Sequence, residues 1–547
     1  MINGDAGGGE TRGTWTPQLK SVGKACSMAT ASKIVRNFYR DSVSLMQLSS
    51  RLAKLPGMIQ ASAVMASESN LALLREAKLL DGVTDAGPND LLITLEGQSE
   101  TAIAGALNEA QAAFDQKATA KSGGVKREAP RSLEMGLELE PNSNFALIST
   151  PGDYAASEAL KALHLGLNVM IFSDNVSSDD EIGLKRYARD HGLLVMGPDC
   201  GTAILNGIPL GFANVIKRGA IGVVAASGTG LQQVTCLVDR LGGGVSQAIG
   251  TGGHDLSREV GGITILQGIE ALAADEATKV IVLISKPPAA DVAKQVLERA
   301  NAAPKPVVVC FLGVDPKTEE GGNLTAARTL EDAAYFAATL AKAQRPAREP
   351  SKPLAKGPKF KLGQKYIRGL YSGGTFCFEA SLLLSDAFSP VYSNTPVGGA
   401  QRLEDVWKSQ AHTLVDLGDD VFTRGRPHPM IDHRLRNERI AKEAADAETA
   451  VILIDVVLGY GAHMNPASEI VPAIGAARKR AAKAGRDLAF VGFVCGTDGD
   501  PQNLSAQEAA LRDAGMVLTR SNAEAVRVAA GLVEPVNRPP AKQRRKT

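Results

Sequence analysis

The 547-residue sequence lacks three features that would point directly to a class of partner. It has almost no net charge, because 60 basic residues nearly cancel 59 acidic ones, which argues against nucleic acid or an anionic membrane surface as partner. Its six cysteines lie far apart with no Cys-x-x-Cys pair, a spacing that fits neither a disulfide framework nor a zinc site. No run is apolar enough to span a bilayer, and the N-terminal residues lack the apolar core of a signal peptide. We therefore expect a cytoplasmic protein without a bound metal, whose ligands are held in local sites.

The chain is long enough for three or four domains, and its apolar fraction of 44% can fill several cores. Regular patterning begins near Lys33, which favours an N-terminal extension, with Met28 as an alternative start. Polar or Pro-rich stretches mark linkers. We expect a disordered extension (1–32), a small α+β domain (33–117), a linker (118–143), two α/β domains (144–218 and 219–343), a linker (344–360), a third α/β domain (361–534) and a basic tail (535–547).

From residue 144 onward, apolar strand-like runs alternate with amphipathic helical patterns. The runs are NFALIS, NVMIF, LLVMG, IGVVA, VSQAIG, KVIVLIS and PVVVCFL, followed after the second linker by YIRGLY, HTLVDLG, TAVILID, LAFVGFV and MVLTR. This rhythm predicts parallel sheets with right-handed crossovers, in which ligands bind at the carboxyl ends of the strands. The expected fold class is α/β, with the N-terminal domain a small α+β module of ferredoxin-like type.

The α/β halves repeat one pattern, in which a strand leads into a Gly-rich helix start. In the first half this start is Ser227-Gly228-Thr229-Gly230, and in the second it is Ser372-Gly373-Gly374-Thr375. Such starts expose unpaired N–H groups, the helix dipole adds positive charge, and the hydroxyl groups add donors. Phosphate, a carboxylate or a carbamoyl-phosphate-like group is the natural ligand. The alternative is a pair of ordinary N-capped turns, but the repetition favours two related anion-binding domains.

Each half also places a histidine and an arginine near a strand end: His254 with Arg258, and His428 with Arg426. Imidazole can move a proton or accept a phosphoryl group, and guanidinium can clamp an oxyanion, so these four are the candidate catalytic residues. The alternative for each histidine is a hydrogen-bonded residue in a turn. Three further residues at strand ends are supporting candidates: Asp199, Cys200 and Asp419. Asp199 can orient a base, whereas Cys200 is interpreted as a packing residue because nothing indicates a depressed thiol pKa.

The residues between 33 and 535 resemble the FdrA family. The motifs that carry the resemblance are FSDNV, LLVMGPDCGT, GFANV, IGVVAASGTG, AIGTGGHDLSREVGG, SKPP, LYSGGT, VDLGDD, GRPHPMID and ILIDVVLGYGA. More distantly, residues 144–340 are similar to the α subunit of succinyl-CoA synthetase, and the C-terminal block is similar to the carboxyl domain of its β subunit. The resemblance implies a Rossmann-like, CoA-binding-type domain at 144–218 and a flavodoxin-like domain at 219–343. It also implies that the helix starts at 227–230 and 372–375 point at one phosphoryl group.

Three departures from that superfamily shape the prediction. The stretch VVVCFLGVDPKTEEGGN corresponds to the loop of the superfamily's phosphorylated histidine and contains no histidine, which excludes phosphohistidine chemistry there. No Gly-rich, CoA-type turn is evident before Phe145, so CoA is a cofactor that the resemblance implies and no motif here identifies. No ATP-grasp domain fits between the halves, so a self-sufficient ATP-driven ligase is not expected.

From the resemblance we predict a transferase, namely a subunit of a carbamoyltransferase-type enzyme. It would act on oxalurate, oxamate and carbamoyl phosphate in allantoin or purine-nitrogen catabolism. Its partners would be a small anionic substrate (phosphate, carbamoyl phosphate or an acyl group), other enzyme subunits and further copies of the chain in a homo-oligomer. The first alternative is an acyl-CoA synthetase of succinate–CoA ligase type, or a CoA transferase, that needs partner subunits. The second is a non-catalytic regulatory or assembly subunit.

Overall fold

The computed structural model describes residues 18–21, 29–40, 42–76, 79–80, 84–119, 130–343, 357–423 and 426–537. The chain divides into two compact units. The first comprises residues 1–127 with 424–427, and the second comprises 128–423 with 428–547. In the part of the chain that is described, no helix combines the length and the apolar character needed to cross a membrane.

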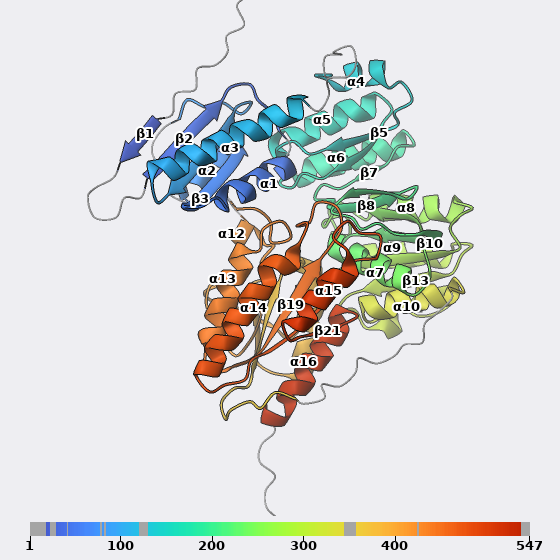
Figure 1. The fold of residues 1–547 in the computed structure, drawn as a ribbon. Helices are drawn as coiled ribbons and strands as arrows, with labels where there is room; N and C mark the ends of the chain where they lie inside the picture. The colour runs from blue at the N-terminus through green and yellow to red at the C-terminus, as the bar shows by residue number, and fades with distance from the viewer. Residues whose placement is uncertain are drawn as a thin grey trace, which may run out of the picture. The chain divides into compact units, whose positions relative to one another are not determined.

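The first unit is a four-stranded antiparallel sheet with helices, drawn in blue in Figure 1. Its elements are β1 (Gln18–Ser21), β2 (Ala29–Val35), α1 (Ser42–Ala53), β3 (Met58–Met65), α2 (Glu68–Glu76), β4 (Leu91–Gly97) and α3 (Glu100–Thr119). The sheet order β1-β2-β4-β3 places β4 between β2 and β3, as in a ferredoxin-like fold. The predicted α+β module is confirmed. The structure differs from the sequence prediction at 1–32, because β1 and the start of β2 pair within the expected extension.

The second unit begins with a small parallel sheet of Rossmann-like type. Its elements are α4 (Leu133–Leu139), β5 (Phe145–Ile148), α5 (Gly152–His164), β6 (Asn168–Ile171), α6 (Ser178–Asp190) and β7 (Val195–Met196), with strand order β5-β6-β7. Helix α4 lies within the stretch 118–143 that the sequence predicted to be a linker. Ser132 is the N-cap of this helix, and its side-chain oxygen accepts a hydrogen bond from the N–H of Met135.

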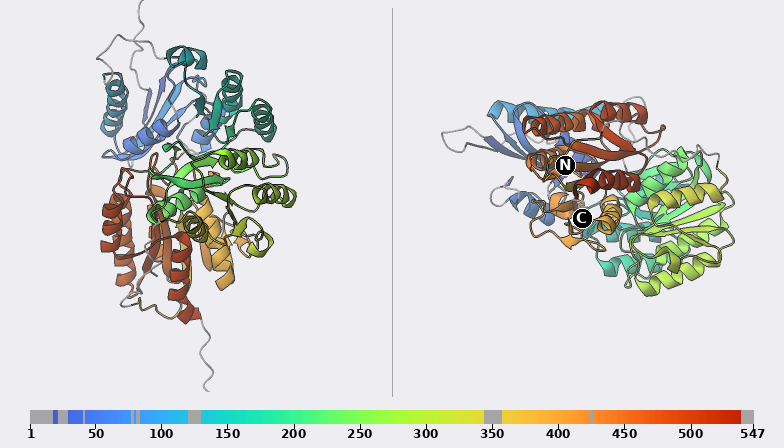
Figure 2. Two further views of the ribbon diagram at one scale, coloured as in Figure 1. Left: turned by 90° about the vertical axis from the view of Figure 1, so that its right-hand side faces the viewer. Right: turned by 90° about the horizontal axis from the view of Figure 1, so that it is seen from below.

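A seven-stranded sheet follows, coloured green to yellow in Figure 1, with helices on both faces in the views of Figure 2. Its elements are β8 (Thr202–Leu205), β9 (Ile208–Gly211), β10 (Arg218–Ala225), α7 (Gly228–Arg240), β11 (Val245–Gly250), α8 (Ile263–Ala274), β12 (Val280–Ser285), α9 (Ala290–Asn301), β13 (Val307–Phe311), β14 (Leu324–Ala326) and α10 (Leu330–Leu340). Strands β11, β10, β12, β13 and β14 are parallel neighbours in that order, and the β8–β9 hairpin pairs antiparallel with β11.

A second seven-stranded sheet, orange to red in Figure 1, is entirely parallel. Its elements are β15 (Tyr366–Tyr371), α11 (Gly374–Ala387), β16 (Val391–Ser393), β17 (Gln401–Arg402), β18 (His412–Asp416), α12 (Asp420–Thr423), α13 (Arg434–Ala445), β19 (Thr449–Val457), α14 (Pro466–Lys483), β20 (Ala489–Cys495), α15 (Leu504–Asp513), β21 (Met516–Thr519) and α16 (Asn522–Asn537). Strand order in this sheet is β17-β16-β18-β15-β19-β20-β21.

The two large sheets share one topology around their first strands. Strand β10 lies between β11 and β12, just as β15 lies between β18 and β19, and each is followed by a helix, α7 or α11. This is the flavodoxin-like strand order, in which ligands bind beside the first strand at the carboxyl edge of the sheet. One hydrophobic core contains residues of both sheets, including Val223 from β10 and Leu453 from β19. The predicted α/β class and the repeat of the two halves are confirmed.

Candidate anion site at two helix starts

Helix α7 begins directly after β10, with Ser227 as its N-cap. The Ser227 hydroxyl accepts a hydrogen bond from the N–H of Gly230 at 3.0 Å. Position 230 requires glycine, because a Cβ there would collide with the Ser227 Oγ. The N–H groups of Gly228 and Thr229 lie in the first helical turn, where the helix itself offers no acceptor. These two donors, supported by the helix dipole, can bind an anion.

Helix α11 begins in the same topological position, but an internal carboxylate occupies its first donors. Asp455 accepts hydrogen bonds from the N–H of Ser372 at 2.8 Å, from its hydroxyl at 2.7 Å and from the N–H of Gly373 at 3.0 Å. Arg436 lies 3.0 Å from the same carboxylate, and both side chains are fully buried. Ser372 and Gly373 therefore do not offer these donors to an external ligand, which differs from the sequence prediction. The N–H groups of Gly374 and Thr375 remain in the first turn of the helix.

The two helix starts meet. The Ser227 Oγ and the Thr375 Oγ1 lie 2.7 Å apart and share a hydrogen bond, although 148 residues separate them in sequence. A Cβ on Gly373 would lie 3.0 Å from the Thr229 Cγ2, so the Thr229 side chain packs closely against the backbone before α11. A cavity of about 180 Å³ opens between them. Its walls are formed by Asp199, Cys200, Gly201, Thr202, Ala225, Ala226, Ser227, Gly228, Thr229, Gly250, Gly252, Gly253, Lys286, Gly374 and Thr375.

Hydrogen bonds between the two large sheets fix this arrangement. Asp500, in the loop after β20, accepts the side-chain N–H of Asn214 and the backbone N–H of Val215, each at 2.8 Å. Arg240, at the end of α7, donates to the carbonyl oxygens of Val494 at 2.8 Å and Gly496 at 2.9 Å. Because these contacts satisfy buried polar groups across the junction, the two helix starts are held against each other rather than merely near each other.

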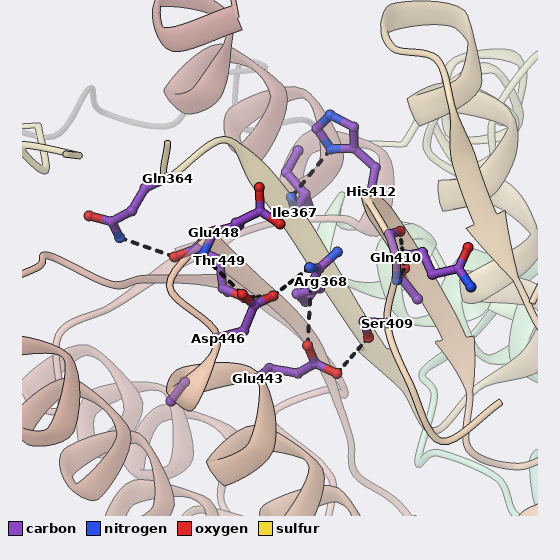
Figure 3. Close-up of polar contacts among 12 residues, drawn as sticks. Gln364, Ile367, Arg368, Ser409, Gln410, His412, Glu443, Asp446, Glu448 and Thr449 are labelled. Atoms are coloured by element: carbon purple, nitrogen blue, oxygen red, sulfur yellow. Dashed lines mark hydrogen bonds and ion pairs between the residues drawn. The ribbon is translucent and has the colours of Figure 1, made fainter. Parts of the chain in front are cut away.

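The opposite end of β15 is anchored in a buried ionic cluster (Figure 3). Arg368, only 2% exposed, lies 3.2 Å from the Glu443 carboxylate and 2.6 Å from that of Asp446, both at the end of α13. Burial raises the pKa of Asp446, but hydrogen bonds from Glu448 and Arg368 outweigh it, and the net shift is downward. Burial, and then Arg368, lower the pKa of the neighbouring His412 to about 4. Helix α13 also carries Arg436, which pairs with Asp455 of β19, so one helix is joined by ion pairs to both β15 and its neighbour β19.

Three charged side chains surround the cavity. Lys286 follows β12, is exposed, and lines the cavity wall. Asp199 also lines it, with its side chain exposed at the rim; desolvation by the surrounding protein, and then the negative charge of Asp174, raise the pKa of its carboxyl group to about 6. Asp416 ends β18 behind Gly374, where a Cβ on that glycine would lie 2.6 Å from the Asp416 Oδ2. Burial raises the pKa of Asp416 to about 7, against the effects of the Gly418 N–H and of Lys286.

The histidine and arginine of the first half lie outside the cavity wall. The His254 side chain is 74% exposed, with its Nδ1 3.8 Å from the Glu181 carboxylate. Arg258 is 73% exposed and pairs at 3.1 Å with Asp291. Both point outward because the turn after β11 is held from its inner side by Asp255, which accepts the N–H groups of Thr264 and Ile265. Neither residue is brought to the helix starts.

In the second half, His428 lies close to the α11 start but is not part of the cavity wall. Its Nδ1 accepts the N–H of Met430 at 3.2 Å, and its ring lies 5.9 Å from that of Phe212. Burial, and then Arg436, lower the pKa of His428 to about 4, so the ring stays neutral near pH 7. Arg426 is exposed and belongs to the segment 424–427 that groups with the first unit. Its predicted role stays a prediction.

Of the three supporting candidates, Asp199 and Cys200 line the cavity and Asp419 does not. Cys200 lines the cavity, but burial raises the pKa of its thiol to about 12, and a neutral thiol is a poor nucleophile. Asp419 does not line the cavity; its carboxylate accepts the N–H of Val421 in the turn at the start of α12. Sequence reasoning missed Lys286 and Asp416. Lys286 directly follows an apolar strand, in the motif SKPP, and Asp416 ends one, in the motif LVD. Their position at the carboxyl end of a strand is the sequence signal that could have identified them.

Comparison of the sequence with those of known proteins identifies the family of this chain. The chain is 44% identical over 503 residues to the uncharacterized protein YahF of Escherichia coli (strain K12), covering 90% of this chain and 97% of that one. The chain belongs to the YahF family. A family model described as CoA-ligase matches residues 370–532, one described as CoA binding domain matches 216–313, and one described as AllF, heavy metal-associated domain matches 28–130.

Two weaker matches to this YahF-family chain are a subunit named as a succinate–CoA ligase, found by sequence, and one solved structure with a low TM-score. Over 151 residues it is 27% identical to the succinate–CoA ligase (ADP-forming) subunit alpha 2 of Archaeoglobus fulgidus, covering 27% of this chain and 51% of that subunit. The dinucleotide-forming acetyl-coenzyme A synthetase 1 of Ca. Korarchaeum cryptofilum is 13% identical, with 72% of this chain and 83% of that chain covered at a TM-score of 0.30. The sequence matches favour the ligase alternative over the carbamoyltransferase that was predicted. The narrower FdrA resemblance stays a prediction.

The heavy metal-associated match does not extend to metal ligands. Residues 28–130 contain neither cysteine nor histidine, the thiolate and imidazole ligands that soft metal ions select. Within the described ranges, no three His, Cys, Asp or Glu side chains gather closely enough to hold an ion. The turn after β2 instead holds Arg36, which lies 2.7 Å from the Asp90 carboxylate. The residues of the stretch 28–130 do not fit a heavy-metal site.

Proposed function

We propose that the chain is a subunit of an acid–CoA ligase-type enzyme that binds a phosphate or acyl phosphate group between the starts of α7 and α11. The observation that carries this proposal is the hydrogen bond between Ser227 and Thr375. It joins the start of α7 to the first turn of α11, two helices that follow strands of separate sheets, at one cavity. Matches to CoA-ligase and CoA-binding models support it. Partner subunits would supply the nucleotide chemistry.

The donors of the cavity suit an oxyanion. The N–H groups of Gly228, Thr229, Gly374 and Thr375 are fixed before the ligand arrives, so they stabilise developing negative charge without reorganising. Lys286 adds a full positive charge at the rim. CoA, when bound, would supply the thiol that carries or accepts the acyl group. Since no histidine of the described chain lines the cavity, the group that these residues would hold is the phosphate itself.

The proposal is tested by a half-reaction that requires no nucleotide. The full-length chain is incubated with succinyl-CoA or acetyl-CoA and with inorganic phosphate, and thiol release is measured. We expect release that depends on phosphate and saturates with it. Lys286→Met should lower the rate about tenfold or more, because a hydrogen bond to a charged group contributes about 1.5–3 kcal/mol.

The matched control is Lys294→Met. Lys294 lies on α9, is 77% exposed and faces Glu298 rather than the cavity. This variant should retain the wild-type rate. If the chain binds neither phosphate nor CoA in calorimetric titrations, and releases no thiol, the ligase proposal is wrong.

Carbamoyl transfer is the second candidate, and one observation favours it. The stretch 307–323 contains no histidine, so a reaction that exchanges an acyl-type group directly with phosphate suits the chain better than one that passes through phosphohistidine. Carbamoyl phosphate is itself an acyl phosphate analogue that the same donors can hold. Formation of carbamoyl phosphate from oxalurate and phosphate, together with no thiol release from acyl-CoA, would support this candidate over the ligase.

A further inference from the structure

Asp199 is a carboxylate in a cavity whose other walls suit a negative ligand. It follows β7 with a backbone φ of 53°, a left-handed conformation that an L-residue adopts at a cost. This backbone directs its side chain to the cavity wall, beside Gly253, where a Cβ would lie 3.5 Å from the Asp199 Oδ2. Among the residues that the structure describes, no side chain or backbone N–H donates a hydrogen bond to this carboxylate, and the Asp199 side chain is exposed, so it is open to solvent and to a ligand in the cavity.

The charges facing Asp199 come from four elements. Asp174 follows β6, His254 follows β11, Lys286 follows β12, and Asp420 begins α12. The two acidic neighbours repel an ionised Asp199, while Lys286, and His254 when it is protonated, attract it. Across the cavity lie the free N–H groups of α7 and α11 and the hydroxyls of Ser227 and Thr375. A dianion bound to those donors would be a further negative charge close to Asp199.

We propose that Asp199 faces the bound anion as a neutral carboxylic acid, so that anion binding takes up one proton from solvent. The uncharged group donates a hydrogen bond to an oxygen of the anion instead of repelling it. The inference rests on the proposed function, since it concerns the same cavity, and it adds the protonation state in which the ligand is held. Asp199 is then the residue from which a leaving group can take a proton.

The sign of the pH dependence follows directly. The pKa of Asp199 is raised to about 6, so the acid form is abundant below that pH and becomes about tenfold rarer with each pH unit above it. Binding of a dianion therefore strengthens as pH falls and weakens as pH rises. Sulfate is the best probe because its charge stays constant over this range, whereas inorganic phosphate itself titrates.

The experiment is a calorimetric titration of sulfate into the full-length chain at pH 6, 7 and 8 and constant ionic strength. We expect the affinity to fall about tenfold from pH 7 to pH 8. Repeating the titration at pH 8 in buffers of different ionisation enthalpy should give an uptake of about one proton per sulfate. In Asp199→Asn, whose amide is neutral at every pH, the affinity should be independent of pH and the proton uptake should vanish.

Two control variants assign the proton. Asp416→Asn and His254→Asn each remove one other titratable group near the cavity. Neither residue lines the cavity, so both variants should retain the fall in affinity between pH 7 and pH 8 and the uptake of about one proton. If Asp416→Asn abolishes proton uptake, or if wild-type sulfate binding is independent of pH, the assignment to Asp199 is overturned while the anion site stands. If neither sulfate nor phosphate binds at any pH, the proposed function fails together with this inference. Should Asp199→Asn not fold, the proton count of the wild type and of Asp416→Asn still decides.

Discussion

Helices α7 and α11 begin at equivalent points of two sheets with the same strand order, yet their first turns are satisfied differently. At α7 the capping oxygen comes from Ser227, a neutral residue of the turn itself. At α11 the capping oxygens come from Asp455, a carboxylate on the neighbouring strand β19. The guanidinium of Arg436 from α13 pairs with this carboxylate. The α7 start resembles an ordinary N-cap, whereas the α11 start depends on a buried ion pair.

This difference shows that duplicated topology need not duplicate chemistry. Both starts keep two free N–H groups in the first turn, so the capacity to bind an anion is common to both. A buried ion pair is costly to break but adds little when intact, because the desolvation of both charges opposes their attraction. Asp455 therefore contributes orientation rather than added stability, because it fixes the two residues directly before α11.

The largest effect should follow from breaking the cap of α11. Asp455→Ala leaves Arg436 as an unpaired buried charge and removes the acceptor of two N–H groups. We expect it to lower the free energy of unfolding by about 3–5 kcal/mol, as measured by urea denaturation. Adding Arg436→Met removes the stranded charge, so the double variant should be more stable than Asp455→Ala alone. A loss below about 1 kcal/mol for Asp455→Ala would contradict the role assigned to the pair.

A smaller effect is expected at α7, where the cap is neutral. Ser227→Ala should cost about 1 kcal/mol, the usual cost of losing an N-cap side chain. Thr375→Val keeps the shape of the side chain and removes only its hydrogen bond to Ser227, for which we expect about 0.5–1.5 kcal/mol.

A double-mutant cycle sharpens this comparison. The double variant Ser227→Ala, Thr375→Val is compared with the two single variants. If the hydrogen bond joins the two helix starts, the double variant should lose less free energy of unfolding than the sum of the two single losses, by about 0.5 kcal/mol or more. Strict additivity would show that the two hydroxyls do not interact in solution.

The strands and the free helix starts could be predicted from the sequence because their signals are local. IGVVA and YIRGLY are short apolar runs that end in glycine-containing turns, and they form β10 and β15. Ser227 and Thr375 were identified from those turns and lie together. The ion pair at α11 could not be predicted, because Asp455 is 83 residues from Ser372 and sits inside an apolar strand that reads as core.

The catalytic candidates illustrate the same limit. His254 and Arg258 follow a strand end in sequence, and proximity to a strand end was the reason for choosing them. The direction of a side chain in a turn depends on the backbone that holds it, and here Asp255 faces inward while its neighbour His254 faces solvent. Lys286 has the weaker sequence signal but lines the cavity, since it follows the strand adjacent to β10.

The smallest effect is therefore predicted at Arg258. Its guanidinium is 73% exposed and pairs with Asp291, which is itself 52% exposed, so solvent screens the pair and its loss changes little. Arg258→Ala should leave both the unfolding midpoint and the affinity for sulfate unchanged, whereas Lys286→Met weakens sulfate binding. Because both variants remove one positive charge, the total charge of the chain cannot explain a difference between them. Equal weakening by the two would mean that the anion is attracted by the general surface rather than by the cavity between the helix starts.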